Sequence, residues 1–469
     1  MIRKDNIYYL LGILIVSILL IISQVILFSK GFYSLSADDA GHTLEAFKWY
    51  AGDHSIFSIW LPFQKLLYGI IFSIYYDLFW VPRIISAFFG LLTLLSLIFM
   101  TYELFRNKII SILAGLLGAI FPSLVIFSIL PMPEIYFFFF IISSIAFYLY
   151  WKRTKNSLSL FSSVIFLSIC TTIRYEAWIF AFFIFLLIII EIYAADEILS
   201  VKYIKMIGIF LLIFAFPIYW IYLSYHTTGE ATSFLHSVSE RYSKGGELTE
   251  IKNNVLFTFF SMNIASLNII GILTLLFYYK KKPGVKEYTH IFLLTILSIG
   301  LITFITKAMP THNFWRLASI WSIMLIPFTA KWLYLFLSDE KLYLKYNFIL
   351  FIILIILSFN SQTSSYTKSS ALTKEDIGIG NYINNFLKFN NENSKIYIER
   401  NGWEFTSILI TSQEPDRFLT NEDISKHPLK YKNLDIEYLI LKSKSEDKAL
   451  TKNYKEVKKF RNWIIYKSD

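Results

Sequence analysis

The sequence has one cysteine, Cys170, among its 469 residues. A single cysteine excludes both a disulfide within the chain and a cysteine-rich metal site. The signatures of nucleotide and zinc enzymes are also missing, since there is no P-loop, no Gly-x-Gly-x-x-Gly and no His-Glu-x-x-His. No Asn-x-Ser/Thr site occurs either, which favours a bacterial or archaeal plasma membrane over a eukaryotic secretory one.

Apolar residues are abundant instead. The chain is 55% hydrophobic and 19% aromatic, and apolar runs of about 20 residues, enough to cross a bilayer, recur along it. The first run is too long for a cleaved signal peptide, so we expect a retained anchor. We therefore predict a polytopic α-helical membrane protein with about eleven transmembrane helices, at residues 7–29, 81–103, 109–129, 134–151, 157–173, 177–195, 205–225, 254–279, 289–306, 314–336 and 346–360.

Basic residues give the chain a net charge of +10, and they gather in short loops between alternate spans. With a cytoplasmic N-terminus, these loops follow the positive-inside rule. Topology thus explains the charge, and no nucleic-acid partner is expected. The same topology places long outer loops at residues 30–80 and 226–253.

The composition changes after Phe359, where the chain becomes polar and charged. We predict a transmembrane catalytic domain over residues 1–360 and a small α/β domain over residues 361–469. Three strand-like runs and one helix-like run support the second domain, at residues 395–399, 436–441, 463–466 and 374–389. An odd number of spans places this domain outside the cytoplasm.

Asp38 and Asp39 form an acidic pair shortly after the first span. They begin a predicted amphipathic helix over residues 39–49, with Leu44, Phe47 and Trp49 available to the membrane interface. Carboxylates at a membrane boundary are costly to desolvate, so they usually bind a cation, pair with a base or move protons. The alternative is a solvated loop start or a helix cap.

Two further groups of charged residues fall at outer turns. Glu134 follows Leu130-Pro-Met-Pro, where prolines break the helix near a possible cavity; the alternative is a solvated turn. Arg174 and Glu176 flank Tyr175 between two spans. They can form a local ion pair, or Arg174 can bind phosphate.

A third group lies at the entry of a late span. His312 and Arg316 are one helical turn apart and share a face. A guanidinium such as that of Arg316 can give phosphate two parallel hydrogen bonds. Lys307 can add positive charge there, or extend to the interface as an ordinary membrane lysine.

The order of these features resembles the GT-C glycosyltransferases that use polyprenyl-phosphate sugars, in particular the relatives of protein O-mannosyltransferases and lipid A aminoarabinose transferases. The resemblance covers roughly residues 7–340. It is carried by the segments Asp38-Asp39-Ala-Gly-His-Thr-Leu-Glu-Ala, Leu61-Pro-Phe-Gln-Lys-Leu-Leu-Tyr68, Arg83-Ile-Ile-Ser-Ala-Phe-Phe-Gly-Leu-Leu-Thr93, Leu130-Pro-Met-Pro-Glu134, Thr172-Ile-Arg-Tyr-Glu176 and Asn313-Phe-Trp-Arg-Leu317.

The resemblance implies transfer of a sugar from a polyprenyl-phosphate carrier to a glycan, lipid or protein acceptor on the outer face, with inversion. Asp38 would act as the base. Asp39 and Glu134 would orient Asp38, contact the sugar or hold a divalent cation. The implied phosphate ligands are Arg174, Arg316 and Lys307, with Glu176 and His312 at the same substrate site.

Two other classes of protein are weighed against this one. A transporter or flippase for lipid-linked or anionic substrates would also bury charged residues, but near the bilayer midplane and often in paired repeats. The predicted spans carry almost no charge at mid-depth, and the polar residues gather at one face. A membrane-anchored structural protein would explain the external domain but not the acidic pair.

Overall fold

The computed structural model describes twelve stretches of the chain, at residues 4–34, 37–58, 60–194, 198–236, 265–305, 314–338, 374–387, 394–400, 405–421, 423, 436–444 and 447–468. Lys307, His312, the predicted span at 346–360 and most of the 226–253 loop lie outside these residues. The predicted domain boundary at residue 360 also lies outside them and stays a prediction.

The chain divides into two compact units, which we describe separately. The first comprises Met1–Leu27, Ser55–Gln64 and Ile85–Ser365, and the second comprises Phe28–His54, Lys65–Ile84 and Tyr366–Asp469. The second unit therefore combines residues of the predicted first outer loop with the C-terminal region.

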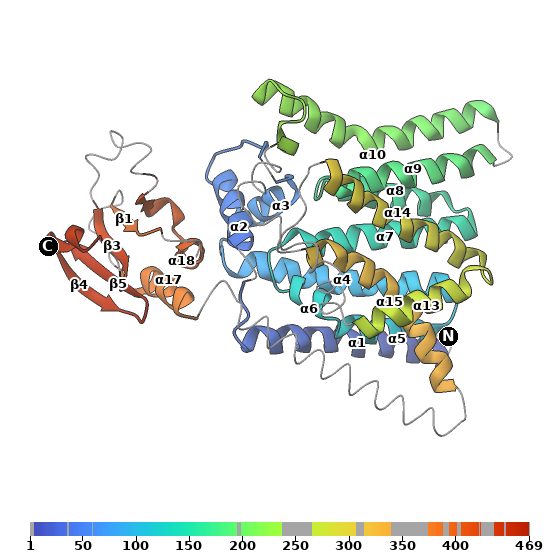
Figure 1. Ribbon diagram of the computed structural model, residues 1–469, viewed down its shortest axis with the longest axis horizontal. Helices are drawn as coiled ribbons and strands as arrows, with labels where there is room; N and C mark the ends of the chain where they lie inside the picture. Colours follow the sequence, from blue (N-terminus) through green and yellow to red (C-terminus); the bar gives the residue numbers. More distant parts are fainter. Residues whose placement is uncertain are drawn as a thin grey trace. The chain divides into compact units, whose positions relative to one another are not determined.

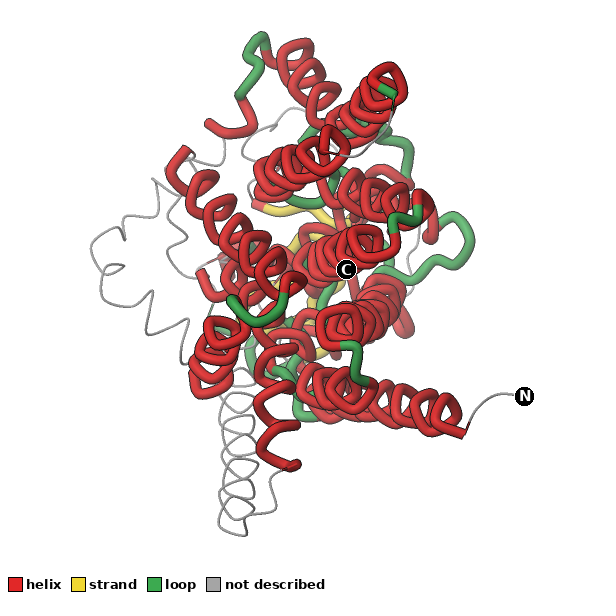
Figure 2. The backbone as a smooth tube through the Cα atoms, turned by 90° about the vertical axis from the view of Figure 1, so that its right-hand side faces the viewer, coloured by secondary structure: helices red, strands yellow, loops and turns green. Residues whose placement is uncertain are grey.

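Helices make up the described part of the first unit, several of them seen nearly end-on in Figure 2. In chain order they are α1 (Lys4–Ser29), α4 (Trp80–Phe105), α5 (Lys108–Ala119), α6 (Pro122–Phe127), α7 (Pro133–Thr154), α8 (Ser157–Thr171), α9 (Glu176–Ala194), α10 (Leu199–Thr228), α13 (Ala265–Tyr279), α14 (Pro283–Ile305) and α15 (Phe314–Ser338); α1 and α4 begin or end in the second unit.

Seven helices in the described part of the chain are long and apolar enough to cross a membrane: α1, α4, α7, α9, α10, α14 and α15. Four shorter apolar helices accompany them, namely α3 (Phe63–Phe72), α5, α8 and α13. Ten of the eleven predicted spans thus contain helix. The span predicted at 109–129 was wrong as a single helix, because Pro122 lacks the N–H that would continue α5 and instead starts α6.

Helix α7 lies at the centre of the first unit. Of the residues in its most apolar window, 83% are buried, against 22% for α10 and 28% for α1, whose apolar side chains face outward as lipid contact requires. Helix α8 packs along α7, as Figure 1 shows, and the Ser144 and Ser163 hydroxyls each donate to the other residue's carbonyl, at 3.0 and 2.8 Å. Small hydroxyl residues let membrane helices approach closely and hydrogen-bond.

The second unit contains a five-stranded mixed sheet of order β2-β1-β3-β5-β4. Strands β1, β2 and β3 run parallel, and β5 runs antiparallel to β3 and β4. The unit includes most of α3, and its other elements are α2 (Ala37–Tyr50), α17 (Lys374–Phe386), β1 (Lys395–Ile398), α18 (Phe405–Ser412), η1 (Pro415–Arg417), β2 (Phe418–Thr420), β3 (Ile436–Lys442), η2 (Asp447–Asn453), β4 (Tyr454–Lys459) and β5 (Trp463–Ser468).

The core of this unit joins both of its sequence regions. Ile379 and Ile383 of α17 pack with buried strand residues such as Ile396, and Leu44 of α2 packs against the same cluster. Phe47 is only 7% exposed. The expectation that Leu44 and Phe47 face the membrane interface was therefore wrong, because the apolar face of α2 is used within the protein.

Gly380 lets α17 approach α18 closely, and this generates a test. A Cβ at Gly380 would overlap Thr411 Oγ1 and lie 2.9 Å from Ile408 O, whereas one at Gly378 on the same helix would meet nothing within 4 Å. Gly380→Ala should destabilise the protein by about 1–3 kcal/mol through overpacking. Gly378→Ala should be neutral or stabilising by up to about 1 kcal/mol, because alanine favours helix.

Thermal unfolding and limited proteolysis of the purified full-length protein in detergent would measure both effects. Equal stability of the two variants would contradict the close packing of α17 on α18.

Candidate functional site

Glu134 is the centre of a buried charge cluster in the first unit. It lies in the first turn of α7, placed there by Pro133 at the helix start, where the helix dipole favours a carboxylate. The residue is 1% exposed. Its Oε1 accepts hydrogen bonds from Arg174 Nη1 at 2.9 Å and from Arg316 Nε at 2.8 Å, and Arg316 Nη2 is also 2.8 Å away.

Arg174 joins this cluster to the connection between α8 and α9. Its Nε and Nη2 donate to the two carboxylate oxygens of Glu176, at 3.2 and 3.0 Å. The local ion pair considered in the sequence is therefore present. The same guanidinium also reaches Glu134, 40 positions away in the sequence, so Arg174 bridges the carboxylates of Glu134 and Glu176.

The second oxygen of Glu134 differs from the first. Oε2 is buried and has no hydrogen-bond partner among the residues that the structure describes. A buried polar atom without a partner carries a desolvation cost of about 1–3 kcal/mol, more when it is charged. Such an oxygen indicates a place where a ligand hydroxyl, a cation or a water completes the carboxylate.

The acidic pair lies in the second unit, in the first turn of α2. Asp39 is 1% exposed, whereas Asp38 is half-buried. The buried Arg83 interacts electrostatically with Asp39, and its guanidinium donates to the carbonyls of Phe79 and Tyr33 at 2.8 and 2.9 Å. The charges of Arg83 and Asp39 thus attract each other at the start of α2, and Asp38 is the more accessible carboxylate of the acidic pair.

Arg83 was named in the family resemblance, but no acidic partner was assigned to it from the sequence. It occurs in the segment Arg83-Ile-Ile-Ser-Ala, and an arginine at the start of an apolar run was the available signal of a buried acidic partner. A second basic residue whose pairing was not predicted is Lys65. Its Nζ lies 3.1 Å from Oε2 of Glu45, which belongs to α2.

The surroundings of Asp39 and Glu134 do not suit the divalent cation that the sequence suggested for them. Within the described stretches, no three His, Cys, Asp or Glu side chains are grouped so that they could hold a metal. Asp39 and Glu134 belong to different units, and both carboxylates are engaged with arginine. The described residues therefore do not form a metal site.

Solved structures of two membrane enzymes have a fold similar to that of this chain. No protein-family model matches the sequence, and no curated protein does. Among solved structures, ArnT from Cupriavidus metallidurans is similar, with TM-score 0.64 and 10% identity over 99% of this chain and 98% of that one. The same protein bound to undecaprenyl phosphate gives TM-score 0.60 and 10% identity, over 96% and 97%.

The Archaeoglobus fulgidus oligosaccharyltransferase is also similar, with TM-score 0.54 and 12% identity over 94% of this chain and 70% of that one. Identities this low show the fold alone. The chain has the GT-C fold of these membrane enzymes, as the sequence predicted.

The buried cluster generates a stability prediction. Glu134→Gln removes the charge that Arg174 and Arg316 share, and breaking a buried ion pair from one side costs about 3–5 kcal/mol. Adding Arg316→Gln to it should restore part of the loss, because one unpaired cation is then removed as well. The coupling free energy between the two changes should be on the order of 0.5–3 kcal/mol in denaturation of the purified protein.

Glu191→Gln combined with Arg316→Gln is the matched control. Glu191 ends α9 and pairs with Lys152 and Lys155, so its effect should add to that of Arg316→Gln. Additive losses for Glu134 and Arg316 would show that their contact contributes nothing.

Proposed function

We propose that this protein is a membrane glycosyltransferase that transfers a sugar from a polyprenyl-phosphate carrier to a glycan, lipid or protein acceptor. The observation that carries the proposal is the buried Glu134 between two guanidinium groups, with one oxygen left without a described partner. The shared fold supports it, because a solved structure of ArnT holds undecaprenyl phosphate and one of the archaeal enzyme holds dolichol phosphate.

Arg174 and Arg316 are the proposed ligands of the donor phosphate. Each guanidinium has five N–H donors in a fixed plane, so it can bind a carboxylate and a phosphate at once. Glu134 contacts both groups through one oxygen and thereby holds them side by side before the donor arrives. Unpaired charge near a membrane is costly. Glu134 therefore neutralises the two guanidinium groups before the donor phosphate binds, and keeps them in position for it. Lys307 and His312 are proposed to add donors at the same site.

Glu134 Oε2 is proposed to accept a hydrogen bond from a hydroxyl of the donor sugar, and Glu176 to hold Arg174 in position. A sugar hydroxyl would supply the hydrogen bond that Oε2 lacks and so offset the desolvation cost of this oxygen. Sugar binding would therefore be favoured by the burial of Glu134.

Asp38 is the proposed base. It takes the proton from an acceptor hydroxyl while that oxygen bonds to the anomeric carbon, and the bond from the anomeric carbon to the phosphate oxygen breaks with its electrons. Polyprenyl phosphate leaves as the anion, and a single displacement inverts the anomeric centre. Asp39 supports this step indirectly, because its charge is directed to Arg83.

We place the reaction on the outer face of a bacterial or archaeal plasma membrane, with the C-terminal domain on the same side, from the positive-inside pattern of the loops. The transporter alternative is not favoured. In the seven described candidate spans, most charged side chains lie near helix ends, as Glu134 and Glu176 do, with Lys331 of α15 an exception.

The test is a comparison of surface glycans and glycolipids by mass spectrometry in cells with the wild-type gene, with no gene and with Asp38→Asn. Loss of a general base usually lowers a rate by about 10²–10⁴-fold, so Asp38→Asn should reduce the sugar-bearing product at least about a hundredfold at normal expression. Asp39→Asn should reduce it less. Asp53→Asn, an exposed aspartate of the same unit, is the control and should leave the product unchanged.

A wild-type amount of the sugar-bearing product in cells with Asp38→Asn would show that Asp38 is not the base. An identical glycan and glycolipid profile with and without the gene would reject the transferase itself.

A further inference from the structure

A cavity of 420 Å³ lies within the second unit. This volume falls in the range of roughly 300–1,000 Å³ that small-molecule sites occupy. Its lining comes from residues around the ends of α1 and α4, from α17 and from the residue after α18. None of these residues belongs to the charge cluster or to the acidic pair, so the proposed transfer reaction leaves the cavity unexplained.

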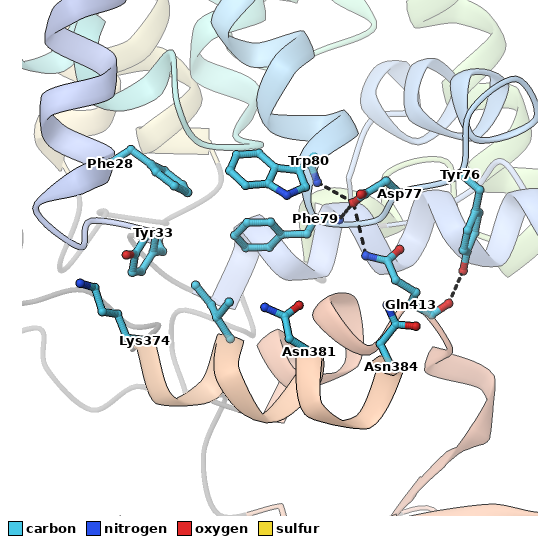
Figure 3. Close-up of a pocket in the computed structure, with 11 residues that line it drawn as sticks. Phe28, Tyr33, Tyr76, Asp77, Phe79, Trp80, Lys374, Asn381, Asn384 and Gln413 are labelled. Carbon is cyan, nitrogen blue, oxygen red and sulfur yellow. Dashed lines mark hydrogen bonds between the residues drawn. The ribbon is translucent and has the colours of Figure 1, made fainter. Parts of the chain in front are cut away.

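One wall of the cavity is aromatic. Phe28 contacts Tyr33 edge to face with ring centroids 4.9 Å apart, and Trp80 lies 5.3 Å from Phe28 and 5.2 Å from Phe79. Trp80 is 48% exposed, so part of its indole is open. Aromatic residues are common at the ends of membrane spans, but here they form a continuous wall facing a polar helix, as Figure 3 shows.

The opposite wall is a stripe along α17. Lys374, Ile377, Asn381 and Asn384 follow a spacing of three, four and three residues, which places them on one face of the helix. Figure 3 shows Lys374 and Asn381 pointing toward Tyr33 and Phe79. The other face, with Ile379 and Ile383, is buried in the core. Lys374, Asn381 and Asn384 are exposed and have no hydrogen-bond partner among the described residues.

The end of the cavity is held by a hydrogen-bonded loop. Gln413 Nε2 donates to Asp77 Oδ1 at 3.3 Å, its Oε1 accepts from Leu78 N at 2.8 Å, and its carbonyl accepts from the Tyr76 hydroxyl at 2.6 Å. Gln413 has φ 65°, a left-handed conformation that glycine adopts more easily after a helix. The side chain of Gln413 hydrogen-bonds Asp77 and Leu78 from this left-handed position and thereby fixes the end of the cavity.

We propose that this cavity binds a pyranose ring of an oligosaccharide. The axial C–H groups of a sugar ring form an apolar face that packs on open aromatic planes such as Trp80. Its hydroxyls both donate and accept, and the amide side chains of Asn381 and Asn384 each offer both roles in one group. Asp77 adds an acceptor, because the hydrogen bonds that it receives in the described part of the chain all go to Oδ1.

A phosphate group fits this lining less well. Lys374 is the one cationic side chain among the lining residues, and the carboxylate of Asp77 opposes an anion. An acyl chain would leave both amides and the carboxylate unpaired, at a desolvation cost. A saccharide matches the aromatic wall and the amide stripe together. This inference goes beyond the proposed transfer, because none of the lining residues takes part in that reaction.

The experiment measures binding of neutral linear oligosaccharides of glucose, mannose and N-acetylglucosamine to the full-length protein in lipid nanodiscs, by saturation-transfer NMR and titration calorimetry. At least one of these should bind the wild type. Asn381→Ala with Asn384→Ala should weaken it about tenfold or more, the scale of two lost hydrogen bonds. Trp80→Ala should also weaken it. Asn385→Ala, an exposed asparagine outside the lining, is the matched control and should not.

Binding of none of the oligosaccharides by the wild type, or equal binding by the double variant and the control, would overturn the proposal. Binding of glycerol phosphate that is lost in Lys374→Ala, without saccharide binding, would assign the cavity to an anionic headgroup instead. Because Asp38→Asn should bind the oligosaccharide normally, failure of this inference and failure of the transferase proposal are separable.

Discussion

The contact of one carboxylate with two guanidinium groups is the constraint on which the first unit depends. Glu134, Arg174 and Arg316 come from the start of α7, the turn before α9 and the start of α15. Charges buried at a membrane are tolerated only when they are paired. The cluster therefore fixes these three helix starts to one another, and it leaves one carboxylate oxygen whose completion requires a further group.

In each unit a buried carboxylate lies against arginine, but we assign the two arrangements different roles. In the first, Glu134 holds two arginines that we propose for phosphate. In the second, Arg83 donates to the backbone carbonyls of Phe79 and Tyr33, and its charge attracts Asp39 of the helix that carries Asp38. A base on a loose loop would sample many orientations, whereas a base in the first turn of an anchored helix keeps its position. Both arrangements are preorganised, the condition under which charged groups contribute most to catalysis.

Apolar runs were enough to predict most of the helices, because helix formation in a bilayer is set by local composition. The GT-C fold was predicted from the resemblance of the ordered charged segments to that family. The pairing of Glu134 with Arg316 could not be predicted, since the two residues are 182 positions apart and nothing local specifies their contact. Strand β4 was missed for a different reason. It is an edge strand with a mostly exposed, lysine-rich sequence, which lacks the alternation of a half-buried strand.

The central claim is that Arg316 binds the donor phosphate through its planar guanidinium. The most direct measurement is native mass spectrometry of the purified protein with undecaprenyl phosphate, comparing wild type with Arg316→Lys and with Arg153→Lys, an arginine paired with Glu103. The account predicts that Arg316→Lys binds the lipid at least about tenfold more weakly, the cost of replacing a bidentate contact by a point charge, while Arg153→Lys binds like wild type. Equal binding by all three proteins would contradict it.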